Sequence, residues 1–63
     1  MKFIYLEDVL YLHNMPANGH SRIYNMLGSL VYDAIGNTID VSFLPAGLYN
    51  LYTGYENIRF VKE

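Results

Sequence analysis

The chain has 63 residues, with six acidic and four basic side chains, no cysteine and an apolar fraction of 52%. This length allows one small domain at most, and the absence of cysteine excludes disulfides and thiolate metal sites within it. The formal net charge of −2 comes from charges spread along the chain without a basic cluster, which argues against nucleic acid as a partner.

The N-terminal end resembles a secretion signal for only a few residues. Residues 1–6 are mostly apolar after Lys2, but Glu7 and Asp8 interrupt the run before an apolar core of about 7–15 residues is reached. No stretch approaches the ~18 uninterrupted apolar residues of a membrane-spanning helix. We therefore expect neither a secretion signal nor a membrane span in this chain.

Short apolar clusters alternate with turn residues along the whole sequence, which is typical of an all-β sandwich or barrel. The many tyrosines favour strands over helices. We expect strands at residues 2–6, 9–14, 21–25, 29–33, 38–42, 48–53 and 57–62, of which the first has the least regular pattern.

Within these strands, alternation predicts which side chains face inward. Leu10 and Leu12 share one face of the 9–14 strand, and Ile39 and Val41 share the inner face of the 38–42 strand. Helix is expected for at most one turn, at residues 25–27.

Residues 44–49 predict a sharp corner between two strands. Pro45 fixes its own φ near −65° and Gly47 can adopt a positive φ, so the Pro-x-Gly segment favours a chain reversal. Tyr49 then falls on the same strand face as Leu51. We expect its ring to be buried and its hydroxyl to reach a backbone partner, as in the tyrosine corners of β-sandwiches.

Metal binding and catalysis have little support in the sequence. His13 and His20, with Asp8 or Asp33, lack the spacing of known metal sites, and we expect the two histidines to face solvent. None of the serines at 21, 29 and 42 lies in a Gly-x-Ser-x-Gly elbow. Glu7 and Asp8 would point to opposite faces of a strand. We expect no metal, no cofactor and no enzymatic activity.

The tyrosines suggest a second class of function. Exposed rings could form a platform on which a sugar or peptide stacks, with the candidates Tyr5, Tyr11, Tyr24, Tyr32 and Tyr52. The alternative is that these residues are ordinary strand residues with one polar end.

Four segments in this order resemble the C-terminal sorting domain (type A) of cargo proteins of the bacterial type IX secretion system. They are DVLYL at 8–12, RIYNMLGSLV at 22–31, IDVSFLPAGLY at 39–49 and RFVKE at 59–63. The resemblance covers residues 8–63 of a single domain that spans 1–63.

The resemblance implies a small immunoglobulin-like antiparallel β-sandwich of six to seven strands without catalytic activity. It also implies recognition by a secretion translocon at the outer membrane and removal by a sortase-like peptidase. The cargo that carries such a domain crosses the periplasm and is secreted or anchored at the cell surface. By position, the motif residues of the family correspond here to Gly28, Pro45, Gly47, Tyr49 and Lys62. Lys62 and the terminal carboxylate on Glu63 would be presented to the receptor.

One departure from the family concerns the opening strand. Family members begin with a Tyr-Pro-Asn-Pro-like segment, whereas residues 3–7 read FIYLE and contain no proline. A sandwich without a docked first strand would leave a neighbouring edge with unpaired backbone groups, and such an edge recruits other strands. We therefore expect the chain to form a homodimer through an exposed strand edge or to swap a strand. A structural or carbohydrate-binding β-sandwich that uses exposed tyrosines is the alternative function.

Overall fold

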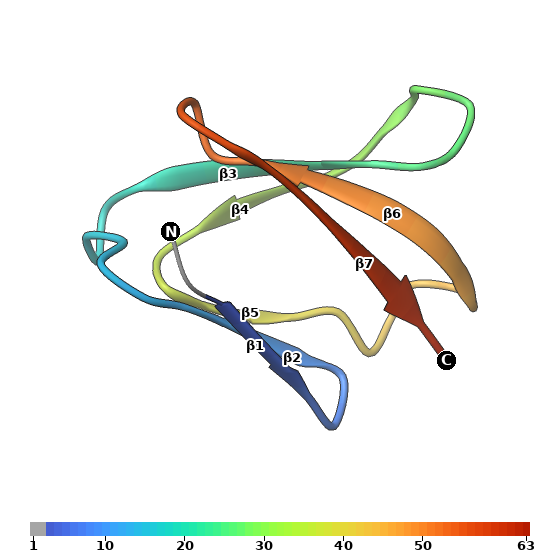
Figure 1. Cartoon of the computed structure of the whole chain (residues 1–63), viewed down its shortest axis with the longest axis horizontal. Helices are drawn as coiled ribbons and strands as arrows, with labels where there is room; N and C mark the ends of the chain where they lie inside the picture. Colours follow the sequence, from blue (N-terminus) through green and yellow to red (C-terminus); the bar gives the residue numbers. More distant parts are fainter. Residues whose placement is uncertain (1–2) are drawn as a thin grey trace.

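The computed structural model describes residues 3–63, which form seven antiparallel strands and no helix (Figure 1). The strands are β1 (Phe3–Leu6), β2 (Val9–Leu12), β3 (His20–Tyr24), β4 (Leu30–Ile35), β5 (Thr38–Asp40), β6 (Gly47–Tyr52) and β7 (Asn57–Lys62). They form a three-stranded sheet in the order β1-β2-β5 and a four-stranded sheet in the order β4-β3-β6-β7.

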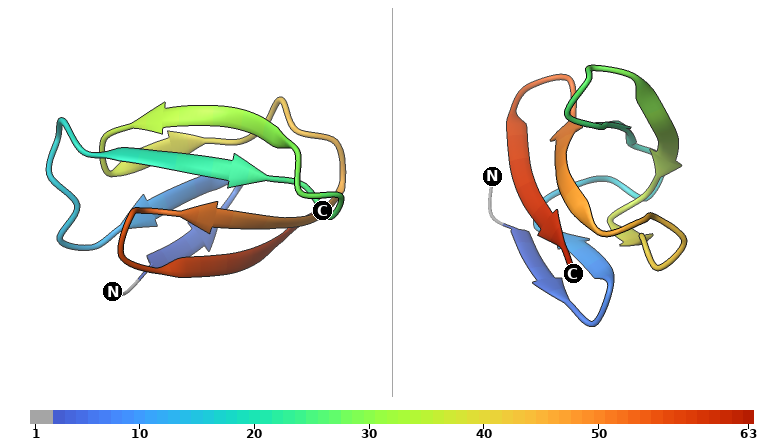
Figure 2. Two further views of the ribbon diagram at one scale, coloured as in Figure 1. Left: turned by 90° about the horizontal axis from the view of Figure 1, so that it is seen from above. Right: turned by 90° about the vertical axis from the view of Figure 1, so that its right-hand side faces the viewer.

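The two sheets face each other as the layers of a sandwich (Figure 2). The β2–β5 pair in one sheet and the β3-β6-β7 order in the other correspond to the B–E and C–F–G pairings of the immunoglobulin fold. β4 adds a fourth strand beside β3, as the C′ strand does in variable-type domains. The predicted small antiparallel β-sandwich of six to seven strands is confirmed.

The core lies between the sheets and follows the predicted alternation. Leu10 and Ile39 are opposed across β2 and β5, and both are buried. Ile23 and Leu51, which belong to the four-stranded sheet, are opposed across β3 and β6, and both are fully buried. Leu12 and Val41 are also buried, so the inward faces predicted for both strands are confirmed.

Several strand ends differ from the prediction because turns begin earlier or later. β2 ends at Leu12, two residues before the expected end, and Asn14 has a left-handed φ of 65° that no strand continues. β4 continues to Ile35, beyond the expected end at 33. Residues 25–28 form a single hydrogen-bonded turn and no helix: the Gly28 N–H donates to the Asn25 carbonyl oxygen, and the Asn25 side-chain oxygen accepts from the N–H groups of Leu27 and Ser29.

The opening strand is present and docked over the described part of the predicted segment, whose first residue, Lys2, lies outside the described residues. β1 pairs with β2 along its whole length, from Phe3 opposite Leu12 to Leu6 opposite Val9. The hairpin closes through Glu7 and Asp8, with φ values of 52° and 66°, a conformation of primed two-residue turns. The expectation that a missing first strand exposes the β2 edge is therefore wrong.

Each sheet has two edge strands, and β1 and β7 lie on the same side of the sandwich (Figure 2, right). β4 and β5 lie on the opposite side. The described residues contain no helix long and apolar enough to cross a membrane.

Candidate functional site

The predicted corner is the best-defined feature among the candidate residues. The Tyr49 hydroxyl donates a hydrogen bond of 2.7 Å to the carbonyl oxygen of Pro45, and the Tyr49 ring is buried. Gly47 has a φ of +157°, in a region that is essentially restricted to glycine. The corner joins β5 to β6, the E and F strands of the fold, where tyrosine corners occur. The predicted geometry of Tyr49 is confirmed.

The corner is packed against the last strand by aromatic rings. Tyr49 lies opposite Phe60 in the β6–β7 register, and their rings stack with centroids 5.7 Å apart. Phe60 also contacts the ring of Tyr5 from β1, with 5.8 Å between ring centroids and an interplanar angle of 38°. Because Tyr5 belongs to the three-stranded sheet, this aromatic column links the two sheets at the end of the sandwich where the chain terminates.

Lys62 stands at the same end but is not presented to solvent. It lies opposite Gly47 in the β6–β7 register, on the inward face, and only 8% of its surface is exposed. Its Nζ atom lies 3.5 Å from Oδ1 of Asp8 and donates to a main-chain oxygen of Glu63 at 3.2 Å. The expectation of an exposed Lys62 is wrong, because the alternation of β7 turns this residue inward and Asp8 compensates its charge.

Asp8 receives a second donor at the same oxygen. The Tyr5 hydroxyl donates to Asp8 Oδ1 at 3.1 Å. Burial, together with the hydrogen bond to Asp8 and the negative charges of Asp8 and Glu63, raises the pKa of Tyr5 above its ordinary value of 10.0. The first hairpin and the last strand are therefore joined by a polar cluster of Tyr5, Asp8 and Lys62.

The sequence did not predict that Tyr5 and Asp8 lie beside Lys62 at this end of the sandwich. Both precede or begin the segment that carries the family resemblance, and the sequence gives no sign that they meet Lys62. The one available signal is the two-residue spacing between the β1 and β2 patterns, which places a turn at Asp8.

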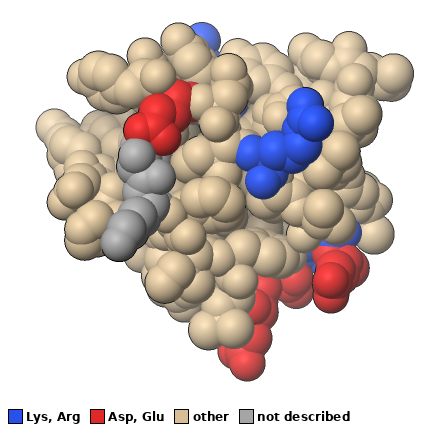
Figure 3. Space-filling view, in the orientation of Figure 1, with Lys and Arg blue, Asp and Glu red and all other residues tan. Residues whose placement is uncertain are grey.

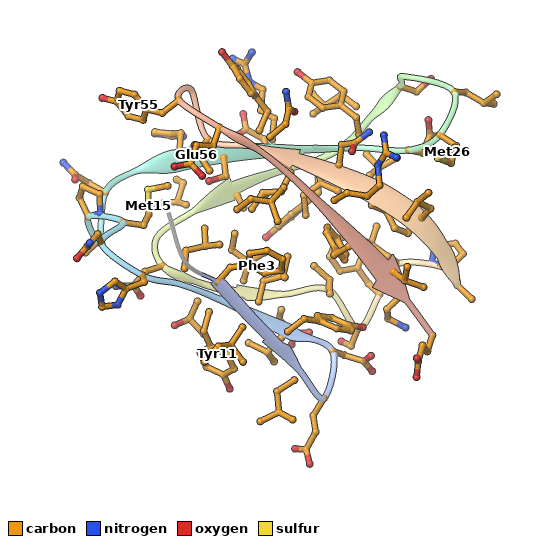
Figure 4. The ribbon with its side chains drawn as sticks, in the orientation of Figure 1. Phe3, Tyr11, Met15, Met26, Tyr55 and Glu56 are labelled. Carbon is orange, nitrogen blue, oxygen red and sulfur yellow. The ribbon has the colours of Figure 1, made fainter. Side chains whose placement is uncertain are left out.

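Gly28 is separate from the other candidate residues. It lies in the β3–β4 loop, in which Figure 4 labels Met26. The φ of Gly28 is +84°. Its N–H donates to the carbonyl oxygen of Asn25 at 3.0 Å. A β-carbon at this position would meet no atom within 4 Å, so only the backbone conformation favours glycine here.

The side chains considered for metal binding and catalysis do not converge. His13 and His20 are exposed, as expected, and His20 Nδ1 lies 3.8 Å from Asp33 Oδ1. No group of three or more potential metal-ligating side chains occurs within residues 3–63. Glu7 and Asp8 occupy a turn instead of a strand, which corrects the expectation that they point to opposite faces of a strand.

The five candidate tyrosines do not form one platform. The Tyr11 side chain lies on the outer face of the three-stranded sheet. The Phe3 side chain points the other way, between the two sheets (Figure 4). Tyr5 is partly buried in the polar cluster, and Tyr32 packs edge-on against Phe43 at 4.9 Å between ring centroids. Tyr24 and Tyr52 alone share a face, the outer face of the four-stranded sheet.

A shallow hollow of about 200 Å³ adjoins Tyr52 on this outer face. It is lined by His20, Arg22, Tyr52, Thr53 and Gly54. Arg22 lies opposite Tyr52 in the β3–β6 register. Within the described part of the chain, no hydrogen bond or ion pair engages the Arg22 guanidinium.

Comparison of the chain with protein-family sequence profiles, with curated proteins and with solved structures found no match.

Proposed function

We propose that this chain is a non-catalytic sorting module that protein partners recognise, similar in role to the C-terminal sorting domains of type IX secretion cargo. The observation that carries the proposal is the tyrosine corner packed on the last strand. Pro45, Gly47 and Tyr49 lie together, and the register places Gly47 opposite Lys62. Four of the five residues that match the family motif therefore meet at one end of the sandwich.

In this proposal the receptor recognises the folded end of the domain. Because Lys62 is buried and paired with Asp8, it fixes β7 against the first hairpin and does not itself provide a free positive charge. The exposed parts of this end are Glu63, Pro45 and Ala46, with Glu7 at the neighbouring turn. The partners are a translocon at the outer membrane and a sortase-like peptidase, and the cargo reaches the cell surface or the medium through the periplasm.

A secretion assay tests the proposal directly. The chain is fused behind a signal peptide and a fluorescent reporter in a host with a working type IX system, beside a copy that ends before Asn57. We expect the reporter outside the cell only with the intact chain. Reporter retained in the periplasm with both fusions would contradict the proposal.

A pair of variants separates recognition from loss of stability. Gly47→Val disturbs the corner at a backbone conformation that valine strongly disfavours. Ile23→Val removes one methylene from the core away from the corner, at a cost of about 0.5–1.5 kcal/mol. Export that fails with Gly47→Val and persists with Ile23→Val supports recognition of the corner. Equal export of both variants would show that the receptor does not recognise the corner.

The hollow beside Tyr52 favours a second candidate function, binding of a carbohydrate or a similar small ligand. An exposed aromatic ring next to an arginine without a protein partner can provide both stacking and hydrogen bonds. Saturable glycan binding that Tyr52→Ala removes and Tyr55→Ala leaves intact would support it, because Tyr55 projects from the β6–β7 turn outside the hollow (Figure 4).

A further inference from the structure

The edge of β1 differs from the other three sheet edges in carrying no charge. β4 contains Asp33, β5 contains Asp40, and β7 contains Arg59 and Lys62. β1 consists of Phe3, Ile4, Tyr5 and Leu6, with no proline. Natural sandwiches protect their edges from other strands with charged residues, proline or bulges. Among the described strands, β1 is the edge without any of these protections.

The view onto this side of the molecule agrees with the strand composition. Uncharged side chains cover β1, and acidic side chains appear at the turn that follows it (Figure 3). Ile4 and Leu6 are 64% and 57% exposed on the outer face. Tyr11, which lies on β2 opposite Ile4, is also exposed and extends the apolar surface from the edge strand onto β2.

The hydrogen-bonding pattern identifies which backbone groups of β1 are free. Leu6 and Val9 flank a two-residue turn, so they form the hydrogen-bonded pair that closes the hairpin, and Ile4 pairs with Tyr11 in the same way. The intervening residues, Phe3 and Tyr5, direct their N–H and C=O groups away from β2. The N–H of Leu12, opposite Phe3, donates to Asn37, on the side away from β1, as this pattern requires.

We propose that a second copy of this chain pairs with the β1 edge in antiparallel fashion, with the two-fold axis passing between the two Ile4 residues. In this register, reciprocal hydrogen bonds join Phe3 of each copy to the partner's Tyr5, which uses every free backbone group of β1. Residues directly opposite share a face, so the outer and inner faces continue from one copy to the other. A six-stranded sheet in the order β5-β2-β1-β1-β2-β5 results.

The second copy is the occupant that this edge fits best because the edge complements itself. Ile4 meets the partner's Ile4 in the non-hydrogen-bonded position, where side chains approach most closely, and Leu6 lies diagonal to it. Pairing centred on Tyr5 would form fewer bonds, since it places Phe3 opposite Glu7, which is in the left-handed turn. A peptide with charged side chains at these positions would lack partners on β1.

The dimer is weak and reversible. A stable interface buries about 800 Å² per partner, roughly a fifth of the 4248 Å² surface of this chain. An edge of four residues supplies less than that. The association is independent of the proposed sorting function.

Cysteine cross-linking tests the register, because the natural chain has no cysteine. In a non-hydrogen-bonded antiparallel pair the Cα atoms are about 4.5 Å apart, a distance that a disulfide can bridge. Ile4→Cys is compared with Ile35→Cys, on the opposite side of the sandwich, because Ile4 and Ile35 are 64% and 62% exposed. Under mild oxidation we expect Ile4→Cys to form disulfide dimers at least about tenfold faster, since proximity raises the effective concentration.

Sedimentation velocity provides the second measurement. The unmodified chain is expected to show a weight-average mass that rises with concentration. Ile4→Lys places two ammonium groups opposite each other and should abolish that rise, whereas Ile35→Lys should preserve it. Equal cross-linking rates of the two cysteine variants, a constant monomer mass of the unmodified chain, or loss of association in both lysine variants would each overturn the proposal.

Discussion

The Lys62 ammonium lies 3.5 Å from the Asp8 carboxylate and thereby ties the last strand to the turn of the first hairpin. The two side chains differ in environment, since 9% of the Lys62 side chain and 45% of the Asp8 side chain are exposed. Loss of the carboxylate therefore leaves a buried cation without its counter-ion, whereas loss of the ammonium leaves a carboxylate that water can reach.

This asymmetry predicts unequal effects of two substitutions. Asp8→Asn keeps a residue type that tolerates the left-handed φ of 66° but removes the charge, and we expect a loss of about 1–2 kcal/mol in the free energy of unfolding. Lys62→Met fills the same inward position with an apolar chain and should cost less. Urea unfolding of both variants measures the difference. A greater loss for Lys62→Met would show that the ammonium is not dependent on Asp8.

The corner hydrogen bond gives a second prediction. Tyr49→Phe keeps the ring that stacks on Phe60 and removes the hydroxyl that donates to the Pro45 carbonyl oxygen. The expected loss of unfolding free energy is about 1–2 kcal/mol, because the carbonyl loses its partner. Tyr11→Phe is the matched control, as its hydroxyl belongs to an exposed side chain on the outer face. Equal stability of the two variants in urea would contradict the assigned role.

The first turn predicts a stabilising substitution. Glu7 has a φ of 52°, which asparagine adopts more readily than glutamate. Glu7→Asn is expected to raise the free energy of unfolding by about 0.5–1 kcal/mol, because asparagine relieves part of the cost of the left-handed conformation. Glu7→Gln removes the same charge without improving the fit to the turn, so it should leave the thermal midpoint near that of the natural chain. A gain of equal size in Glu7→Gln would assign the effect to charge.

The environment of Tyr5 predicts a loss of stability in alkali. Burial and the Asp8 hydrogen bond raise the pKa of Tyr5 in the folded state above the ordinary value of 10.0. The folded state therefore holds the phenol proton more tightly than the unfolded state does. This contribution is fully present below pH 10 and is lost as the pH rises through the folded pKa. Unfolding free energies measured up to that range should fall less steeply for Tyr5→Phe, and identical slopes would refute the assignment.

The sequence determined the features that depend on residues close together in the chain. The alternation of apolar residues predicted strands and, in segments 9–14 and 38–42, their inward faces, because side chains of a strand repeat every two residues. Pro45 and Gly47 predicted the corner, since their φ preferences act within the segment itself. The position of Tyr49, two residues after Gly47, predicted that its hydroxyl would donate a hydrogen bond to the backbone.

The tertiary structure alone decided which distant segments meet. Tyr5, Asp8 and Lys62 converge because β1 and β7 lie on the same side of the sandwich, and no local pattern expresses that pairing of sheet edges. The opening strand docks without the prolines of the family motif, because an apolar segment and a tight turn suffice to pair it with β2. Local sequence thus specified the strands, and the packing of the two sheets specified the environment of the charges.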